Sequence, residues 1–405
     1  MQKFFTPSRR GTNSVKWDLS QRSNLIPLWV ADMDFTAPQA VLAALNARIE
    51  HGVFGYTFAG EQFYQSFCGW MQRRHGCTVV PDELQFAPGV MPFLRAALSG
   101  LVPSGGTVVV PEPVYYPFFS AVTDANLNLK AVALQQELSG RYVFDYAALT
   151  DAMQGADALL LCSPQNPVGR VWSEQELRRV LKIAAEQKVL VLVDEIHQDI
   201  LFPNARFVPV WQVVSNTPEL TAVSTRLIAV TAPSKTFNIP GLSSALVWTR
   251  DAQLKKQISE LLHARSLDLP NVLALEAATA AYNKGDNWLD TVLDTIYSNY
   301  QIVLEWSRRM GIGCVPQEGT YLVWLDFRST GCVEQAAGSA LAAWLRSRCG
   351  VWLSEGSDFT SLFSEGSRKA GSGFLRLNLA APPERIREAL QRITALLSEC
   401  SEREA

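Results

Sequence analysis

Four short and almost continuous apolar runs constrain the fold of this chain more than any other feature. They occupy residues 107–110, 158–162, 189–193 and 227–230. A strand with one exposed face alternates apolar and polar side chains, so unbroken runs favour strands that are covered on both faces. Such strands are typical of a mostly parallel sheet. Each run is also short enough to be one strand.

A helix is predicted between the second and third runs. Ser173 and Glu176 have the spacing of a capping box, in which each side chain satisfies a backbone amide of the other residue. Apolar residues then follow at helical spacing, namely Leu177, Val180, Leu181, Ala184 and Ala185. Strand, helix and strand joined by short connections predict the α/β class with helices on both faces of the sheet.

The chain has 405 residues, which exceeds the usual size of one hydrophobic core. From about residue 287 the pattern changes to long helices and a few strands, with strand-like segments at 320–326 and 374–379 and a final helix near 383–400. We therefore predict a large α/β domain over 49–288. Residues 1–48 and 289–405 would form a smaller α+β domain, in which the Gly- and Ser-rich segment 354–373 is expected to be a loop.

Charge and cysteine content exclude several classes of protein. The formal net charge is −3 and no basic cluster stands out, which argues against nucleic acid and anionic membranes as partners. No window reaches the roughly 20 apolar residues of a membrane span, and the N-terminus lacks a signal-peptide pattern. The seven cysteines are scattered without a Cys-x-x-Cys pair. We expect a cytoplasmic protein without structural disulfides or zinc.

Reactive and aromatic residues follow each apolar run, at 111–118, 163–169, 194–197 and 231–241. Ligands of open α/β sheets bind beyond the carboxyl ends of the strands, so these segments are expected to meet. Together they supply a lysine, a carboxylate, an asparagine and aromatic rings. The segment 84–89 adds Gly89 before a predicted helix, whose free amides and dipole favour a phosphate. A lysine, a carboxylate and a phosphate site together suggest pyridoxal phosphate.

The segments SPQNPVG (163–169), DEIH (194–197) and APSKTFNIPG (232–241) resemble the fold-type I pyridoxal-phosphate enzymes of the class I/II aminotransferase family. WVADMDF (29–35) and HGVFGY (51–56) are similar to its MalY/PatB subgroup of cystathionine β-lyases, which are C–S lyases. Matching motifs extend from about residue 28 to 379. The resemblance implies a pyridoxal-phosphate fold with a large cofactor-binding domain and a smaller domain.

The resemblance also implies roles for individual residues. Lys235 would be the Schiff-base lysine, and Asp194 would pair with the protonated pyridine nitrogen. Asn166 would donate to the phenolic oxygen of the cofactor and lie near the substrate. Tyr115 would stack on the pyridine ring, although the neighbouring Tyr116 competes for this role.

His197 stands where the subgroup carries histidine. Period-two alternation would place residues 194 and 197 on opposite faces, so the chain must leave strand geometry between them. The other phosphate-binding candidates are Ser234 and the amides of Val90 and Met91. Tyr56 would reach the phosphate of a neighbouring subunit, which implies a homodimer with active sites at the subunit interface.

Arg376 resembles the arginine that clamps the α-carboxylate of the substrate. Many aminotransferases of the family carry another arginine eight residues after the lysine, whereas this chain has Ser243. This difference favours C–S β-elimination of L-cystathionine or a related cysteine thioether, giving thiol, pyruvate and ammonia. Transamination of an amino acid is the alternative. A cofactor-bearing protein that binds a regulator, with secondary lyase activity, is a further one.

A metal site is an alternative interpretation of the residues after the third apolar run. Glu195, His197 and Asp199 alternate along the chain and could line one face of a strand as ligands. The other three histidines are scattered at 51, 75 and 263, and no cysteine motif supports a metal. We therefore expect no metal, and Glu195 and Asp199 are left without a predicted role.

Overall fold

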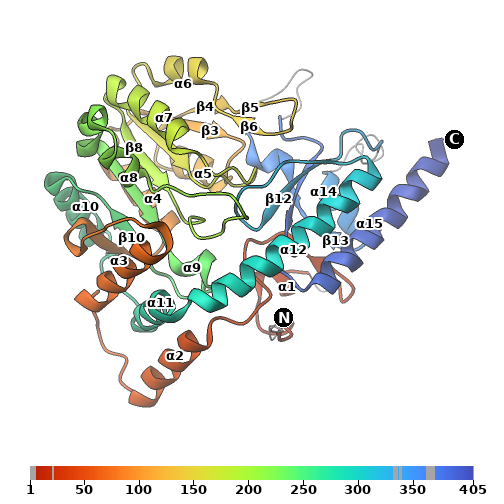
Figure 1. Ribbon diagram of the computed structural model, residues 1–405, viewed down its shortest axis with the longest axis horizontal. Coiled ribbons are helices and arrows are strands. Elements are labelled where there is room, and N and C mark those ends of the chain that lie inside the picture. The colour runs from red at the N-terminus through yellow and green to blue at the C-terminus, as the bar shows by residue number, and fades with distance from the viewer. Residues whose placement is uncertain (1–5, 21, 332–335, 337–339, 362–369, 405) are drawn as a thin grey trace.

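A seven-stranded sheet is the centre of the larger part of the molecule (Figure 1). The computed structural model describes residues 6–20, 22–331, 336, 340–361 and 370–404, so the predicted loop 354–373 lies partly outside the described residues. Strands from β9 to β4 are parallel to their neighbours, and β10 runs antiparallel to both β2 and β9. In spatial order the strands are β2 (Leu84–Ala87), β10 (Ala245–Trp248), β9 (Leu227–Thr231), β8 (Leu190–Asp194), β7 (Ala158–Cys162), β3 (Thr107–Glu112) and β4 (Asn128–Ala133).

The four apolar runs form β3, β7, β8 and β9, and helices cover both faces of these strands, which confirms the predicted α/β fold. Side chains alternate between two separate cores. In β8, Val191 and Val193 pack on one face and Leu192 packs on the other. The helices of the first face are α3 (Glu61–His75), α6 (Tyr146–Met153), α7 (Glu174–Gln187), α8 (Val210–Ser215) and α11 (Val272–Lys284), and those of the second are α4 (Val90–Leu101), α5 (Pro117–Thr123) and α10 (Ala252–Ala264).

Local sequence signals account for where several of these helices begin. The predicted capping box is present at α7, where Ser173 and Glu176 bond each other's backbone amides. Asp145 and Asp251 cap α6 and α10 through their side chains. Such caps satisfy amides that have no partner within the helix, and each contributes about 1 kcal/mol.

The C-terminal part contains a second, antiparallel sheet with its own core. Its spatial order is β11 (Gly313–Cys314), β12 (Leu322–Asp326), β15 (Phe374–Asn378) and β14 (Ser354–Glu355). The N-terminal β1 (Ile26–Pro27) pairs in parallel with β13 (Val351–Trp352), which joins the two ends of the chain in one unit. The helices of this unit are α1 (Val15–Asp18), α12 (Asp286–Met310), α14 (Leu341–Arg348) and α15 (Pro383–Glu404).

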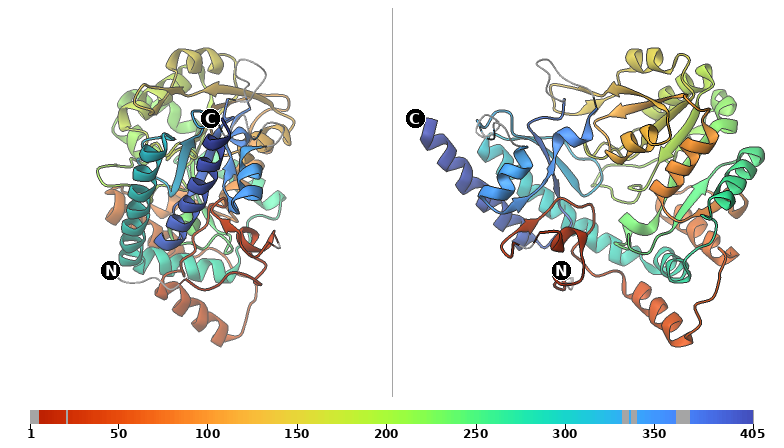
Figure 2. Two further views of the ribbon diagram at one scale, coloured as in Figure 1. Left: turned by 90° about the vertical axis from the view of Figure 1, so that its right-hand side faces the viewer. Right: turned by 180° about the vertical axis from the view of Figure 1, so that it is seen from behind.

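Helix α12 connects the two parts (Figure 1). Its Leu289 packs in the core of the large sheet, whereas Val292 and Ile296 pack in that of the small sheet. The predicted domain limits at 48/49 and 288/289 stay a prediction. Helix α2 (Gln39–His51) lies at the periphery in both turned views (Figure 2), together with the segment that leads to α3. None of the described helices is long and apolar enough to cross a membrane.

Candidate active site

Asp194 is the last residue of β8, and its carboxylate lines a cavity of about 220 Å³ at the carboxyl edge of the sheet. Its Oδ1 accepts a hydrogen bond from the Ile196 amide at 3.0 Å. Burial raises the pKa of Asp194 to about 7, although the Ile196 amide and the charge of Lys235 act in the opposite direction. The chain turns directly after β8, so His197 lines the same cavity as Asp194. This is the departure from strand geometry between residues 194 and 197 that the sequence predicted.

Lys235 enters the cavity from the short helix α9 (Pro233–Thr236), which follows β9. Its Nζ donates to the carbonyl oxygen of Ala31 at 2.6 Å. Burial lowers the pKa of this amine to about 8, with Asp32 and Asp194 opposing and Arg376 adding to the effect. A lysine with a pKa near 8 is partly neutral at physiological pH, so it can act as a nucleophile or a base.

One end of the cavity offers hydrogen-bond donors without partners. Gly89 precedes α4 with a φ of +146°, a conformation that favours glycine, and the first amides of α4 belong to Val90 and Met91. Both residues line the cavity, as do Ser234 and Ser244. The buried Oγ of Ser244 has no hydrogen-bond partner among the described residues. A helix N-terminus surrounded by hydroxyls is a suitable site for a phosphate.

The imidazole of His197 is held neutral. Burial, together with the positive charges of Lys235 and Arg376, lowers its pKa to about 3. Its ring lies edge-to-face to Tyr321 with centroids 6.0 Å apart, and its buried Nδ1 has no partner in the described part of the chain. A neutral imidazole with a free nitrogen is therefore available to a bound group.

Tyr115 lines the cavity, whereas the neighbouring Tyr116 does not and is 43% exposed. Burial raises the pKa of Tyr115 to about 12, so its hydroxyl stays protonated at neutral pH. Asn166 is buried and lines the same cavity after β7. The structure thus brings Tyr115 rather than Tyr116 to the predicted site, next to Asn166.

Arg376 points from β15 of the small sheet toward the large domain. It donates to Asn166 Oδ1 at 3.0 Å, to the Trp29 carbonyl oxygen at 2.8 Å and to Ser354 Oγ at 3.2 Å. Burial lowers its pKa to about 10, so it remains charged at neutral pH. Within the described residues no carboxylate pairs with this buried guanidinium. Because an unpaired buried charge is costly, the arrangement favours an anionic ligand.

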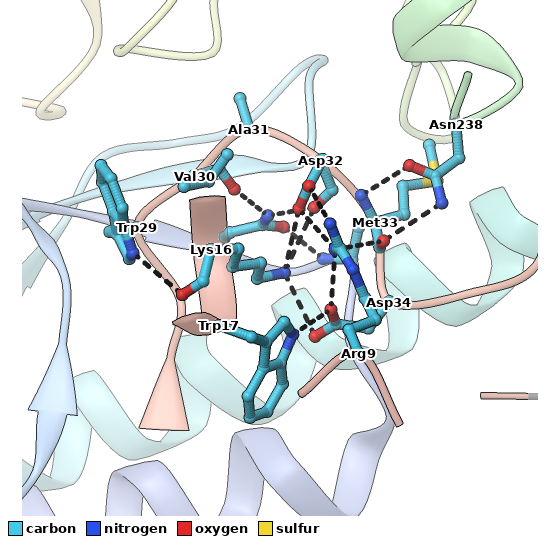
Figure 3. A network of polar contacts seen from close by, with 12 residues as sticks. Arg9, Lys16, Trp17, Trp29, Val30, Ala31, Asp32, Met33, Asp34 and Asn238 are labelled. Atoms are coloured by element: carbon cyan, nitrogen blue, oxygen red, sulfur yellow. Dashed lines mark hydrogen bonds and ion pairs between the residues drawn. The ribbon is translucent and has the colours of Figure 1, made fainter. Parts of the chain in front are cut away.

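The segment 29–34 contributes Ala31 to the wall of the cavity, and a charged network holds this segment in place (Figure 3). Lys16 lies between Asp32 and Asp34 with its amine 3.5 and 3.1 Å from their oxygens. Arg9 and Arg385 complete the network at 2.6 Å from Asp32 and 2.7 Å from Asp34, respectively. In the sequence this segment is visible only as a family motif, whereas the structure shows that its carbonyl oxygens accept hydrogen bonds from both Lys235 and Arg376.

Asp199 stabilises α9, the helix that carries Lys235. Its carboxylate accepts from Thr236 Oγ1 at 2.7 Å and from Trp70 Nε1 at 2.9 Å, and it contacts His75 Nε2 at 2.7 Å. Since Thr236 follows Lys235, these bonds fix the position of α9. These bonds could not be predicted from the sequence, because the four residues come from three distant segments.

Glu195, His197 and Asp199 do not converge as the metal alternative required. Glu195 turns away and accepts from the Val210 amide at 2.8 Å, and burial raises its pKa to about 8. No group of three or more His, Cys, Asp or Glu side chains suited to a metal occurs in the described part of the chain. Tyr56 is 98% exposed and does not line the cavity of its own chain.

The chain belongs to the family described as aminotransferase class I and II, whose sequence profile matches residues 23–393. It is similar to cystathionine β-lyase PatB of Bacillus subtilis, with 32% identity over 96% of this chain and 98% of that protein. Protein MalY of Escherichia coli is 28% identical over 94% of this chain and 95% of the length of MalY.

Among solved structures, the chain is similar to cystalysin from Treponema denticola, which contains a pyridoxal 5'-phosphate cofactor. The two share 29% identity over 98% of each chain, with a TM-score of 0.88. The pyridoxal-phosphate-bound C–S lyase from Staphylococcus hominis is 27% identical over 98% of each chain, with a TM-score of 0.87. The predicted family and fold are therefore confirmed.

Proposed function

We propose that this protein is a pyridoxal-phosphate-dependent C–S β-lyase that cleaves L-cystathionine or a related cysteine thioether. With one water molecule, the thioether yields a thiol, pyruvate and ammonia. Three similarities support this assignment. PatB is a cystathionine β-lyase, cystalysin contains pyridoxal 5'-phosphate, and the Staphylococcus hominis protein is a C–S lyase with bound pyridoxal phosphate. The observation that carries it is that Lys235 and Arg376 line one cavity, in which a bound amino acid would lie between them. The Arg376 guanidinium there has no carboxylate partner among the described residues.

The cavity residues fit the cofactor. The unpartnered Ser244 hydroxyl and the amides of Val90 and Met91 suit its phosphate, together with Ser234. The free Nδ1 of His197 can take a further hydrogen bond. At the other end, Asp194 would hold the proton on the pyridine nitrogen, Asn166 would donate to the phenolic oxygen, and Tyr115 would stack on the ring.

When bound, pyridoxal phosphate withdraws electrons from the substrate Cα and makes the proton there acidic. Arg376 would hold the α-carboxylate through its two terminal nitrogens and so orient the Cα–H bond toward Lys235. Lys235, once free, would take that proton at its Nζ. Its lowered pKa favours this role because the neutral amine is well populated near pH 8.

Tyr56 supports the further proposal that the protein works as a homodimer. It lies in an exposed apolar segment with Phe54 and Phe58, between α2 and α3. Clustered exposed aromatic residues are typical of interfaces between protein chains. A second copy covering this segment would bring Tyr56 to the phosphate end of the neighbouring cavity. A cytoplasmic location and a regulatory partner stay predictions.

Replacement of Lys235 tests the proposed function. With L-cystathionine, Lys235→Ala should lower kcat for pyruvate release by about a thousandfold or more, because the general base is lost. Lys182→Ala, on the exposed side of α7, is the matched control and should behave as the unaltered protein. Undiminished turnover by Lys235→Ala would refute the role of this lysine.

A further inference from the structure

A second and larger cavity adjoins the first on the side of the small domain, and we call it the outer cavity. It measures about 480 Å³ and shares Ala31, Tyr115 and Lys235 with the first cavity. Arg376 lines it as well. If the cofactor fills the first cavity, a substrate would lie between Lys235 and Arg376. Its side chain would then extend into the outer cavity.

One wall of the outer cavity is an aromatic surface that carries a cation. Trp29 and Trp352 stack with ring centroids 4.5 Å apart and an angle of 12° between their planes. The guanidinium of Arg346, from α14, lies 4.5 Å from the centroid of the Trp352 ring. Arg346 is half-buried and forms no ion pair with a carboxylate in the described residues. This cation therefore keeps its hydrogen-bond donors for an anion.

A carboxylate stands in the same cavity. Glu355, from β14, is half-buried, and its Oε2 accepts from the Ala342 amide in the first turn of α14 at 2.8 Å. Burial raises the pKa of Glu355, and the charge of Asp358 nearby raises it further. Asp358 lines the cavity too. A positive charge placed here would favour the ionised form of Glu355.

We propose that the outer cavity binds the leaving-group arm of the substrate and selects thioethers whose arm ends in an aminocarboxylate. Arg346 binds the distal carboxylate and Glu355 binds the distal ammonium group, while the tryptophan pair contacts the methylenes between them. This inference rests on the proposed function. A short S-alkyl group reaches neither charge, so Arg346 and Glu355 determine specificity and take no part in bond breaking.

Two non-cleavable compounds test this assignment on the cofactor-loaded protein. L,L-2,7-Diaminosuberate has the chain length of cystathionine with a methylene in place of sulfur, so nothing can leave. L-2-Aminooctanoate has the same length but ends in a methyl group. Their dissociation constants, read from the change in cofactor absorbance, should differ by about tenfold or more in favour of diaminosuberate, as partly buried charge pairs predict.

Two variants test whether Arg346 and Glu355 cause the preference for diaminosuberate. Arg346→Gln and Glu355→Gln should each reduce the affinity ratio of the two compounds by about tenfold. Glutamine at 355 can still accept from the Ala342 amide, so α14 keeps its cap. Arg179→Gln is the matched control, because its guanidinium also lies over an aromatic ring, 3.7 Å from the centroid of Tyr146, outside the cavity.

Equal binding of the two compounds by the unaltered protein would overturn the inference. An affinity ratio that Arg346→Gln and Glu355→Gln leave unchanged would overturn it too. Failure of the proposed function looks different. In that case no thioether yields pyruvate, while the preference for diaminosuberate and its loss in both variants persist.

Discussion

Lys16→Met probes the charged network that holds the segment 29–34 over the site. The Lys16 side chain is fully buried, and its amine is 3.1 Å from Asp34 and 3.5 Å from Asp32. Removing one partner of a buried ion pair generally costs 3–5 kcal/mol. Because Arg385 still lies 2.7 Å from Asp34, we expect a loss at or slightly below the lower limit of this range, about 2–3 kcal/mol in the free energy of unfolding.

Urea unfolding of the cofactor-free protein at pH 7 measures this loss, with Lys256→Met as the control. Lys256 is 77% exposed and pairs with Glu260 at 3.8 Å one helical turn away. Exposed pairs of this kind contribute about 0.5 kcal/mol or less. A loss for Lys16→Met no larger than that of Lys256→Met would refute the idea that the network stabilises the segment.

The difference between Lys16→Met and the unaltered protein should also depend on pH. Burial opposes ionisation of Asp34, but Lys16, Trp17 and Arg385 outweigh it and lower the pKa of Asp34. A lowered carboxyl pKa stabilises the folded state above the unfolded pKa of about 4, and this stabilisation is lost as the pH falls. The stability difference should therefore stay the same from pH 7 to about pH 4 and shrink as the pH falls further, toward the lowered pKa of Asp34. A difference that stays constant below pH 4 would contradict this explanation.

Two further predictions concern the site. Asp194→Asn should lower kcat by about a hundredfold or more while the cofactor stays bound, because the proton on the ring nitrogen is no longer held; equal kcat at equal cofactor content would contradict this. Light scattering after gel filtration should give twice the mass of one chain, and Tyr56→Ala should weaken cofactor retention without changing that mass. A monomer with full activity would refute the shared site.

The fold and the edge of the sheet that carries the site could be predicted from sequence because their signals are local. Unbroken apolar runs define β3, β7, β8 and β9, and in a parallel sheet their carboxyl ends meet by geometry. Asp194, Asn166 and Lys235 therefore had to lie close together. The choice of Tyr115 over Tyr116 was open, since either ring of a neighbouring pair can face inward until the packing of α5 is known.

Contacts between distant segments could not be predicted. Lys16, Asp34 and Arg385 each resemble ordinary surface charges in sequence. Their segments meet through contacts between the two ends of the chain, such as the pairing of β1 with β13 and the bond from the Asp34 amide to the Ala380 carbonyl oxygen. In the same way, Asp199 contacts His75, which lies 124 residues earlier in the chain. A single sequence contains no periodic signal for such pairs.

The central claim is that this site eliminates a thiol from a cysteine thioether. Its most direct test supplies the cofactor-loaded protein with L-cystathionine and no keto acid, and measures pyruvate and free thiol in the same samples. We expect sustained release of both in equal amounts over many turnovers. A single turnover without pyruvate, after which a keto acid restores activity, would show transamination and exclude β-elimination as the reaction of this site.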